Sequence, residues 1–167
     1  MSATVATVDE QKADLRRELR ARRKGLPDRS ERSATIVRRL QAFQTVAAAG
    51  RAMVYSSLPG EPDLEPLAAW CRAEGKDVLV PEAEPNPSWP DLVVVPGVAF
   101  TRTGDRLGQG GGWYDRFLVR TRPGCIHVGV AFDFQLLDAV PSAPHDVRLH
   151  GVVTDAGAWW CTKMRIR

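Results

Sequence analysis

The centre of the chain, residues 91–117, reads DLVVVPGVAFTRTGDRLGQGGGWYDRF. It begins with a continuous apolar run at 91–96, which is typical of a strand covered on both faces of a sheet. A turn then leads into a stretch with four glycines among positions 108–112, and a helix is expected to start there and to run through DRFLVR. Functional loops in layered α/β folds lie beyond the carboxyl ends of the strands, so the sequence predicts a binding loop at this point.

Further strands are expected on both sides of this centre, at 53–57, 78–81, 126–132 and 151–154. The run at 78–81 is continuously apolar, as in a strand covered on two faces. Residues 82–90, EAEPNPSWP, contain three prolines and are expected to form a loop.

Helical patterns separate these strands. A helix is expected at 9–25, with Leu15, Leu19 and Leu26 on one side and a cationic stripe of Lys12, Arg16 and Arg20 along another. Asp28 and Glu31 form a candidate capping box for a second helix, whose expected buried stripe is Ile36, Leu40, Phe43 and Ala47. A third helix is expected at 62–76, with Gly75 as its C-terminal cap.

This alternation predicts an α/β fold with a mainly parallel sheet, flanking helices and an N-terminal helical pair. We expect a flexible N-terminus at 1–8, a single domain at 9–157 and a C-terminal tail at 158–167, for which the sequence suggests no role.

Composition favours a cytoplasmic, single-domain protein. The 167 residues are 44% hydrophobic and 26% charged, as in ordinary globular proteins. The first eight residues do not resemble a secretory signal, and no apolar run approaches the roughly 20 residues of a membrane span. Cys71, Cys125 and Cys161 are far apart, which supports neither a disulfide framework nor a zinc motif. Residues 1–50 carry 11 Lys and Arg against 6 Asp and Glu, so the positive charge belongs to the N-terminal helices.

The glycine stretch has the chemistry of a phosphate site. Glycine loses more backbone entropy on folding than any other residue, so four together need a reason. Their free N–H groups, with a helix beginning among them, attract an anion, and Arg106 adds a bidentate donor. A carboxylate at Asp115 would repel a phosphate unless a cation such as Mg²⁺ lay between them. The alternative is a flexible surface turn.

Three familiar sites are excluded. The stretch lacks the Lys-Ser/Thr pair of a Walker A loop, and the third glycine of the dinucleotide fingerprint is replaced by Trp113. His145 suggests a hydrolase triad, but the chain has no G-x-S-x-G nucleophile elbow.

Residues 106–118, RLGQGGGWYDRFL, resemble the signature RLGxGxGYYDxxL of the 5-formyltetrahydrofolate cyclo-ligase (methenyltetrahydrofolate synthetase) family. The resemblance continues, in the family's order, in KADLRRELRARRKGL (12–26), YSSLPGEPDLEPL (55–67), DLVVVPGVAFTRTGDRLG (91–108), VGVAFDFQ (128–135) and VPSAPHDVRLHGVVT (140–154).

The resemblance implies a NagB/ribose-isomerase type of fold and an enzyme that uses MgATP to close 5-formyltetrahydrofolate into 5,10-methenyltetrahydrofolate. It places ATP against Lys12, Arg16, Arg106, Leu107, Gly108, Gln109, Gly110, Gly111, Gly112, Trp113 and Tyr114. It places the folate against Ser56, Glu61, Gln109, Gly110, Gly111, Gly112 and Trp113. Magnesium is expected on Asp115 and Asp146, and the catalytic candidates are Arg106 and Asp115.

Taken without the resemblance, several of these residues have plainer interpretations. Lys12 and Arg16 suit the solvated face of a surface helix. Glu61 suits the start of a helix, just before Pro62, and Asp146 suits a simple turn.

The chain departs from the family pattern in three places. Gln109 replaces a common aromatic, Trp113 replaces the first tyrosine of Tyr-Tyr-Asp, and the connection at 82–90 lacks an insertion that helps cover the folate. Trp89 is a candidate substitute as an aromatic facing the pterin.

Three functions are therefore considered. The first is the cyclo-ligase, with a reduced folate as its partner, no nucleic acid and no membrane, and with a monomer favoured although the sequence does not fix the oligomeric state. The second is a shortened relative that binds MgATP but acts on or senses another small molecule. The third is a nucleic-acid-binding module built on the arginine-rich helices, which the absence of aromatics from residues 1–42 disfavours.

Overall fold

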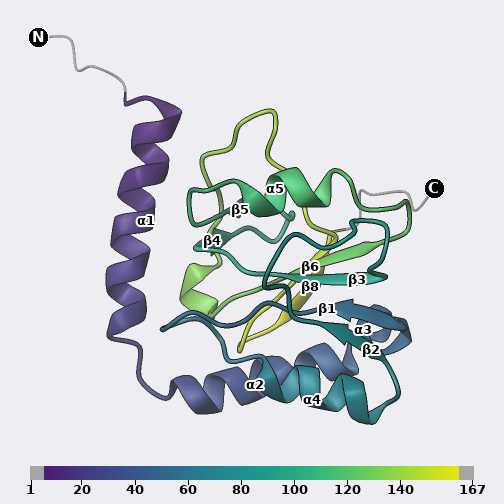
Figure 1. The fold of residues 1–167 in the computed structure, drawn as a ribbon. Coiled ribbons are helices and arrows are strands. Elements are labelled where there is room, and N and C mark those ends of the chain that lie inside the picture. Colours follow the sequence, from purple (N-terminus) through teal and green to yellow (C-terminus); the bar gives the residue numbers. More distant parts are fainter. Residues whose placement is uncertain (1–5, 162–167) are drawn as a thin grey trace, which may run out of the picture.

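The computed structural model describes residues 6–161, and its centre is a six-stranded sheet with the order β2-β1-β3-β6-β7-β8 (Figure 1). The strands are β1 (Arg51–Met53), β2 (Asp77–Leu79), β3 (Leu92–Val95), β6 (Ile126–Val130), β7 (Gly151–Val153) and β8 (Ala158–Trp160). All neighbours pair in parallel except β8, which runs antiparallel to β7. The predicted α/β fold with a mainly parallel sheet is thus confirmed.

Helices cover both faces of this sheet. In Figure 1, α2 (Arg29–Ala42), α3 (Gln44–Ala48) and α4 (Glu65–Ala73) lie on one side and α5 (Trp113–Leu118) lies on the other. The side chains of β3 alternate between the two layers: Leu92 and Val94 join the core under α2 and α4, and Val93 and Val95 join the core under α5. All four are buried, as the apolar run predicts.

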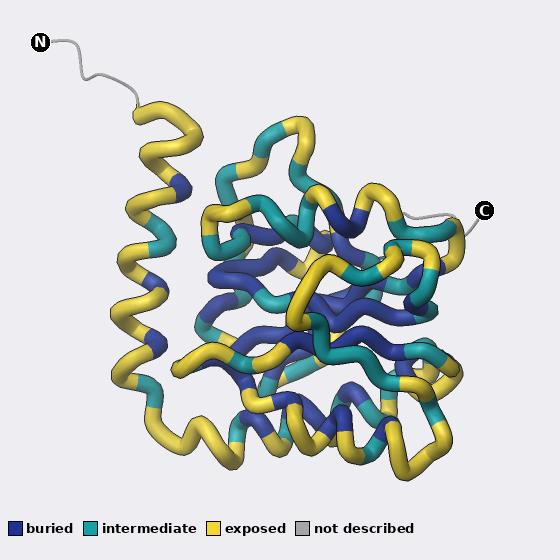
Figure 2. The backbone as a smooth tube through the Cα atoms, in the orientation of Figure 1, coloured by how far each residue is buried: buried dark blue, intermediate teal, exposed yellow. Residues whose placement is uncertain are grey.

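The helix α1 (Val8–Lys24) stands beside the sheet rather than on either face (Figure 1). Its Leu19 packs against a separate two-stranded hairpin, β4 (Ala99–Phe100) and β5 (Arg106–Leu107). Figure 2 shows an exposed helix with a few buried positions, which are Lys12, Leu19 and Arg23. The predicted separation of an apolar and a cationic side is therefore wrong, because Lys12 and Arg23 share the inward face with Leu19.

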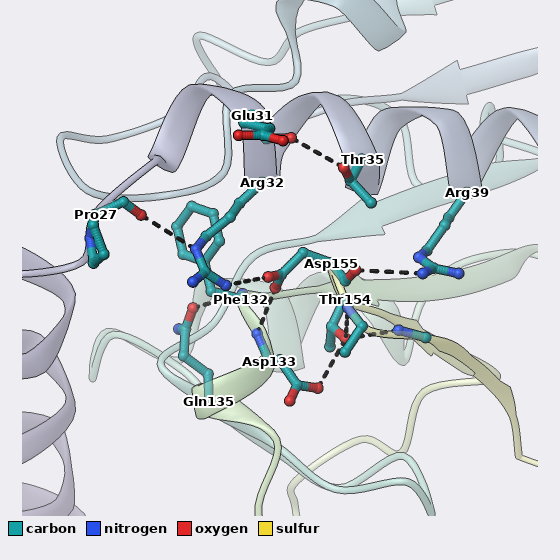
Figure 3. A network of polar contacts seen from close by, with 12 residues as sticks. Pro27, Glu31, Arg32, Thr35, Arg39, Phe132, Asp133, Gln135, Thr154 and Asp155 are labelled. Carbon is teal, nitrogen blue, oxygen red and sulfur yellow. Dashed lines mark hydrogen bonds and ion pairs between the residues drawn. The ribbon is translucent and has the colours of Figure 1, made fainter.

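Asp155, in the turn between β7 and β8, holds α2 against the loops of the sheet (Figure 3). Arg32 of α2 donates to the Asp155 carboxylate at 2.5 Å, and the other oxygen of this carboxylate accepts from the backbone N–H of Asp133 at 2.7 Å. Asp133 begins the short 3₁₀ helix η1 (Asp133–Gln135) after β6. One carboxylate thus joins α2 to the loops that follow β6 and β7.

Several local expectations need correction. Asp28 adopts a left-handed conformation (φ 56°) and its side chain caps nothing, so the predicted capping box is wrong. The capping box belongs instead to Thr7 and Glu10 at the start of α1. The second helix is interrupted at Phe43, between α2 and α3. Ala47 is therefore exposed and not part of the predicted buried stripe. At the sheet edge, β2 is only half-buried, in contrast to the two-faced burial expected for it.

The termini also differ from expectation. The first helix begins at Val8 rather than Asp9. Residues 158–160 of the expected tail form β8 and so belong to the sheet. The remainder of that tail, 162–167, and residues 1–5 lie outside the described part of the chain. Among the helices of residues 6–161, none has the length and apolarity that a membrane crossing requires.

A buried imidazole lies at the start of β6. His127 is 6% exposed, shares a hydrogen bond with Thr121 at 2.9 Å, and its Nδ1 finds no partner within residues 6–161. Burial, with a smaller contribution from His150, lowers the pKa of His127 from 6.5 to about 3. The ring therefore stays neutral in the folded protein at pH values where it is protonated in the unfolded chain.

We expect this imidazole to make the protein acid-sensitive. Stability rises with pH wherever the unfolded state binds more protons, which for His127 is the range between its folded and unfolded pKa values. Between about pH 7.5 and about pH 5, the wild-type free energy of unfolding should fall by about 2 kcal/mol more than that of His127→Phe. Urea denaturation at both pH values measures this difference. His145→Gln, at an exposed histidine, should keep the wild-type dependence, and an unchanged dependence in His127→Phe would contradict the assignment.

Candidate functional site

The site lies where the strand order reverses. From β1 the chain passes to β2 on one side and then returns to β3 on the other side. The segments that leave the carboxyl ends of β1 and β3 therefore diverge and leave a crevice between them, which is where ligands bind in open α/β sheets. The predicted binding loop, 106–115, follows β3 by way of the β4–β5 hairpin and occupies this crevice.

A cavity of about 340 Å³ opens there. Tyr55, Ser56, Leu58 and Glu61 line it from the segment after β1, and Arg106, Gly108, Gln109, Gly111, Gly112, Trp113, Tyr114 and Asp115 line it from the binding loop and α5. Pro81 and Pro96 complete the wall. The structure thus brings together the residues expected to contact the folate, Ser56 and Glu61 included; Gly110 lines the neighbouring cavity instead.

The glycine loop is shaped by two backbone conformations that side chains rarely adopt. Gly110 has φ 118°, and Gly112, with φ 65°, is the N-cap of α5. Within residues 6–161, the backbone N–H groups of Gly110, Gly111 and Gly112 donate to no protein group. The expected set of free amides is therefore present. However, α5 has only six residues, so its dipole adds less positive charge than the sequence suggested.

Arg106 supplies the charge at the centre of the loop. Its side chain is 3% exposed and donates to the carbonyl oxygen of Pro96 at 3.1 Å and to Asp115 Oδ2 at 3.0 Å. The other oxygen of Asp115 accepts from the backbone N–H of Val147 at 3.2 Å. The Nε of Arg106 is buried and has no partner in the described part of the chain. A guanidinium in this state has donor capacity left for an anionic group.

A second cavity, of about 470 Å³, lies between the loop and α1. Lys12 and Arg16 of α1 line it together with Asp146 and His145. Lys12 Nζ contacts Asp146 Oδ2 at 2.7 Å, and Arg16 Nε donates to the carbonyl oxygen of Gly108 at 2.9 Å. These two cations therefore do not lie on a solvated helix face.

The carboxylate of Asp146 is held ionised. Burial raises the pKa of Asp146, but the hydrogen bonds from Lys12 and from the backbone N–H of Ala143 outweigh burial, and the net pKa lies below its usual value. Asp146 is therefore an anion at neutral pH and more than a simple turn residue, because it anchors α1 to the segment before β7.

The two cavities share a wall made of Arg106, Gly108, Gly112 and Asp115. One side of this wall carries Lys12, Arg16 and Asp146, and the other carries Ser56, Glu61 and Trp113. Two ligands bound on the two sides would meet at Arg106. This is the arrangement that transfer of a group between two substrates requires.

The donor set fits Mg²⁺, although it forms no complete cage. Asp115 and Asp146 both line the second cavity, and within residues 6–161 no cluster of three or more His, Cys, Asp or Glu residues is placed to hold a metal ion. Mg²⁺ is commonly held by one or two carboxylates, with waters and phosphate oxygens filling its other positions. Each carboxylate also pairs with a protein cation, Arg106 or Lys12.

Aromatic residues form the floor of the first cavity. Trp113 stacks on Phe117 with ring centroids 5.1 Å apart, and it meets the edge of Tyr114 at 4.7 Å. Burial raises the pKa of Tyr114 well above its ordinary value, so this phenol stays neutral. Leu107, which was expected to contact the nucleotide, lines the second cavity but is buried against Leu19. Trp89 does not line the first cavity, where the shortened connection contributes only Pro81.

Sequence reasoning missed the contacts of Arg20. Its guanidinium donates to Gln109, at 2.8 Å to the carbonyl oxygen and at 2.9 Å to the side-chain oxygen. The helical spacing of Lys12, Arg16 and Arg20 indicated that all three share a stripe. The target of Arg20, which lies 89 residues away, carries no local signal.

Comparison with known proteins identifies relatives of this chain. A sequence model of the 5-formyltetrahydrofolate cyclo-ligase family matches residues 8–90 and 87–155. The 5-formyltetrahydrofolate cyclo-ligase of Escherichia coli K12 is 29% identical in a comparison that covers 84% of this chain and 98% of the relative. The protein of the same name from Mycolicibacterium smegmatis is 39% identical over 79 residues, 42% of this chain and 41% of the relative.

Two solved structures of methenyltetrahydrofolate synthetases have the same fold as this chain. The NMR structure of Aquifex aeolicus 5,10-methenyltetrahydrofolate synthetase matches with a TM-score of 0.80 and 27% identity, over 92% of this chain and 94% of that one. A synthetase of the same name from Mycoplasma pneumoniae shares the fold, with a TM-score of 0.76 and 23% identity, over 86% of this chain and 98% of that one. The two family-model matches meet at residues 87–90, inside the short connection between β2 and β3.

The glycine loop can be tested by a matched pair of substitutions. Gly110→Ala should lower the free energy of unfolding by about 1–3 kcal/mol, because a φ of 118° is strained for alanine. Gly111→Ala should change it by less than about 0.5 kcal/mol, since a Cβ there meets no atom within 4 Å. Urea denaturation of both variants checks the difference, and equal effects would show that the loop does not hold this backbone conformation.

Proposed function

Because the chain belongs to the 5-formyltetrahydrofolate cyclo-ligase family, we propose that it closes 5-formyltetrahydrofolate into 5,10-methenyltetrahydrofolate with consumption of ATP. The observation that carries this proposal is the wall of Arg106, Gly108, Gly112 and Asp115 between two cavities. One cavity is cationic and suits a triphosphate. The other is aromatic and contains a buried carboxylate, which suits a pterin.

The reaction needs this arrangement because a formamide oxygen is a poor leaving group. In the proposed sequence, the γ-phosphoryl group of ATP moves to the formyl oxygen and ADP is released. N10 of the folate then attacks the activated carbon and loses its proton. The bond between this carbon and the phosphorylated oxygen breaks, inorganic phosphate leaves, and the methenyl bridge between N5 and N10 remains.

In the phosphate half, the chain supplies charge and position. Lys12 and Arg16 neutralise phosphate oxygens, and the free amides of Gly110 and Gly112 donate hydrogen bonds to them. Arg106, fixed by Asp115, stands where the phosphoryl group crosses and stabilises the charge of the transition state. Mg²⁺ held by Asp115 and Asp146 would neutralise further phosphate charge.

In the folate half, Glu61 is the recognition group. It is 8% exposed and lines the cavity together with Ser56 and Trp113. An ionised carboxylate only accepts hydrogen bonds, so it matches the N–H groups at the edge of a pterin. The cavity has a volume of about 340 Å³, at the lower end of the range for small-molecule sites. A cavity of this size suits a bicyclic ring such as a pterin.

A second function has one observation in its favour. The connection between β2 and β3 is short, and Pro81 is the one residue of this connection that lines the cavity, so one side of the folate half has little cover. A shortened relative that binds MgATP but acts on another small molecule would have this shape. Calorimetry separates the two functions, since binding of an ATP analogue without binding of 5-formyltetrahydrofolate would favour the second.

The direct experiment mixes the protein with MgATP and 5-formyltetrahydrofolate and follows the near-ultraviolet absorbance of the methenyl product. Arg106→Lys should reduce kcat by about 10²-fold or more, because an ammonium cannot reproduce the bidentate geometry. Arg120→Lys, at a half-exposed arginine outside both cavities, is the control. Wild-type protein that leaves both substrates unchanged would refute the proposed function.

The magnesium role is tested separately with Asp115→Asn. Loss of the carboxylate charge should raise the Mg²⁺ concentration that gives half-maximal activity by about tenfold or more, since Mg²⁺ prefers ionised oxygen ligands. The control is Asp105→Asn, at a carboxylate that pairs with Arg148 and lines neither cavity. An unchanged Mg²⁺ dependence in Asp115→Asn would leave this residue only the role of fixing Arg106.

A further inference from the structure

Gln109 connects the two halves of the site. Its Oε1 accepts from Arg20 of α1 at 2.9 Å, and its Nε2 donates to Glu61 Oε1 at 3.0 Å. We propose that Gln109 is a positioning residue that holds Glu61 ready for the folate and makes this readiness depend on α1. The proposal rests on the proposed function, since it assigns Glu61 to the folate.

The orientation of this amide follows from its neighbours. An arginine only donates hydrogen bonds, and an ionised carboxylate only accepts them. The oxygen of the Gln109 amide must therefore face Arg20 and its nitrogen must face Glu61. The same Nη2 of Arg20 also donates to the carbonyl oxygen of Gln109 at 2.8 Å, which fixes the backbone at this position.

Glu61 is held at both oxygens. Its Oε2 accepts from the backbone N–H of Leu58 at 2.9 Å, and its Oε1 accepts from Gln109. With these two bonds the carboxylate cannot rotate freely, although each oxygen keeps a further acceptor site. A ligand N–H that enters the cavity therefore meets an anion already in place, and the cost of ordering the side chain does not fall on binding.

The connection continues to the phosphate half. Arg16 and Arg20 are one turn apart on α1 and hold the consecutive residues Gly108 and Gln109. Arg16 and Lys12 also line the cavity assigned to the triphosphate. A nucleotide that orders this side of α1 thus also orders Gln109 and, through it, Glu61. By linkage, nucleotide and folate should each strengthen the binding of the other.

A purely structural tether predicts a different outcome. If Gln109 only tied the loop to α1, its loss would loosen the loop that both substrates touch, and the affinities for nucleotide and folate would fall together. A positioning role predicts that folate affinity falls while nucleotide affinity is preserved.

The test uses Gln109→Met, which keeps the length of the side chain and the backbone contact with Arg20 but removes both amide bonds. Calorimetry should show the Kd for 5-formyltetrahydrofolate rising about tenfold, as expected for loss of a hydrogen bond to a charged group. The Kd for a non-hydrolysable ATP analogue should stay within about twofold, and its strengthening of folate binding should disappear.

Two variants sharpen the result. Gln109→Glu keeps an acceptor for Arg20 but places a second carboxylate against Glu61, so folate binding should weaken further than in Gln109→Met. Arg17→Met is the control, because Arg17 is an exposed residue of the same helix whose ion pair within residues 6–161 is with Asp14 alone.

The outcomes separate this inference from the function beneath it. If the unchanged protein binds 5-formyltetrahydrofolate and Gln109→Met binds it equally well, or loses nucleotide affinity to the same degree, the positioning role is overturned alone. If the unchanged protein does not bind 5-formyltetrahydrofolate, the proposed function and the positioning role both fall.

Discussion

The ion pair between Arg106 and Asp115 is the constraint around which the site is arranged. The guanidinium is 3% exposed, and a charge so far from water is tolerated only with a partner. Removing one member of a buried pair typically costs about 3–5 kcal/mol. This pair joins β5 to α5, and its further bonds reach Pro96 after β3 and Val147 before β7. The strand β5, the helix α5 and the segments after β3 and before β7 are thereby held around one charge.

A second consequence of this arrangement is that α1 belongs to the site. The helix touches neither face of the sheet, and its apolar attachment runs through Leu19 and the β4–β5 hairpin. Polar contacts supply the rest: Lys12 with Asp146, Arg16 with Gly108, and Arg20 with Gln109. Lys12 and Arg16 therefore both hold the helix and line the second cavity, so that anion binding and helix docking depend on the same two groups.

Sequence patterns predicted the parts of the fold that depend on local order. The apolar run of β3 and the glycine loop were both recognisable, because burial on two faces and tight backbone turns restrict residue types directly. The capping box at Asp28 was wrong because Asp28 adopts a left-handed conformation, not the extended one typical of an N-cap, and its side chain makes no capping hydrogen bond. The strand β8 went unrecognised, since a run of three residues is too short to show a period.

In the candidate site, too, the residues grouped in one short motif were predicted, and the contacts between distant residues were not. The resemblance in residues 106–118 brought together most of the cavity lining, and Glu61 and Ser56 proved to share that cavity. Contacts across long sequence distances were beyond prediction: Lys12 and Asp146 lie 134 residues apart, and nothing near Gln109 indicates that it faces Glu61. Such pairs depend on how the sheet is wound rather than on any neighbouring residue.

The carboxylate of Asp155 has an implication for how the protein is made. It lies 123 residues after Arg32, its partner on α2, and it also holds the loop after β6 (Figure 3). During synthesis α2 leaves the ribosome well before this anchor, because 123 residues separate Arg32 from Asp155. The layer of α2, α3 and α4 therefore lacks this ion pair until β6 and β7 have been made, and in that interval a nascent chain would most need protection by a chaperone.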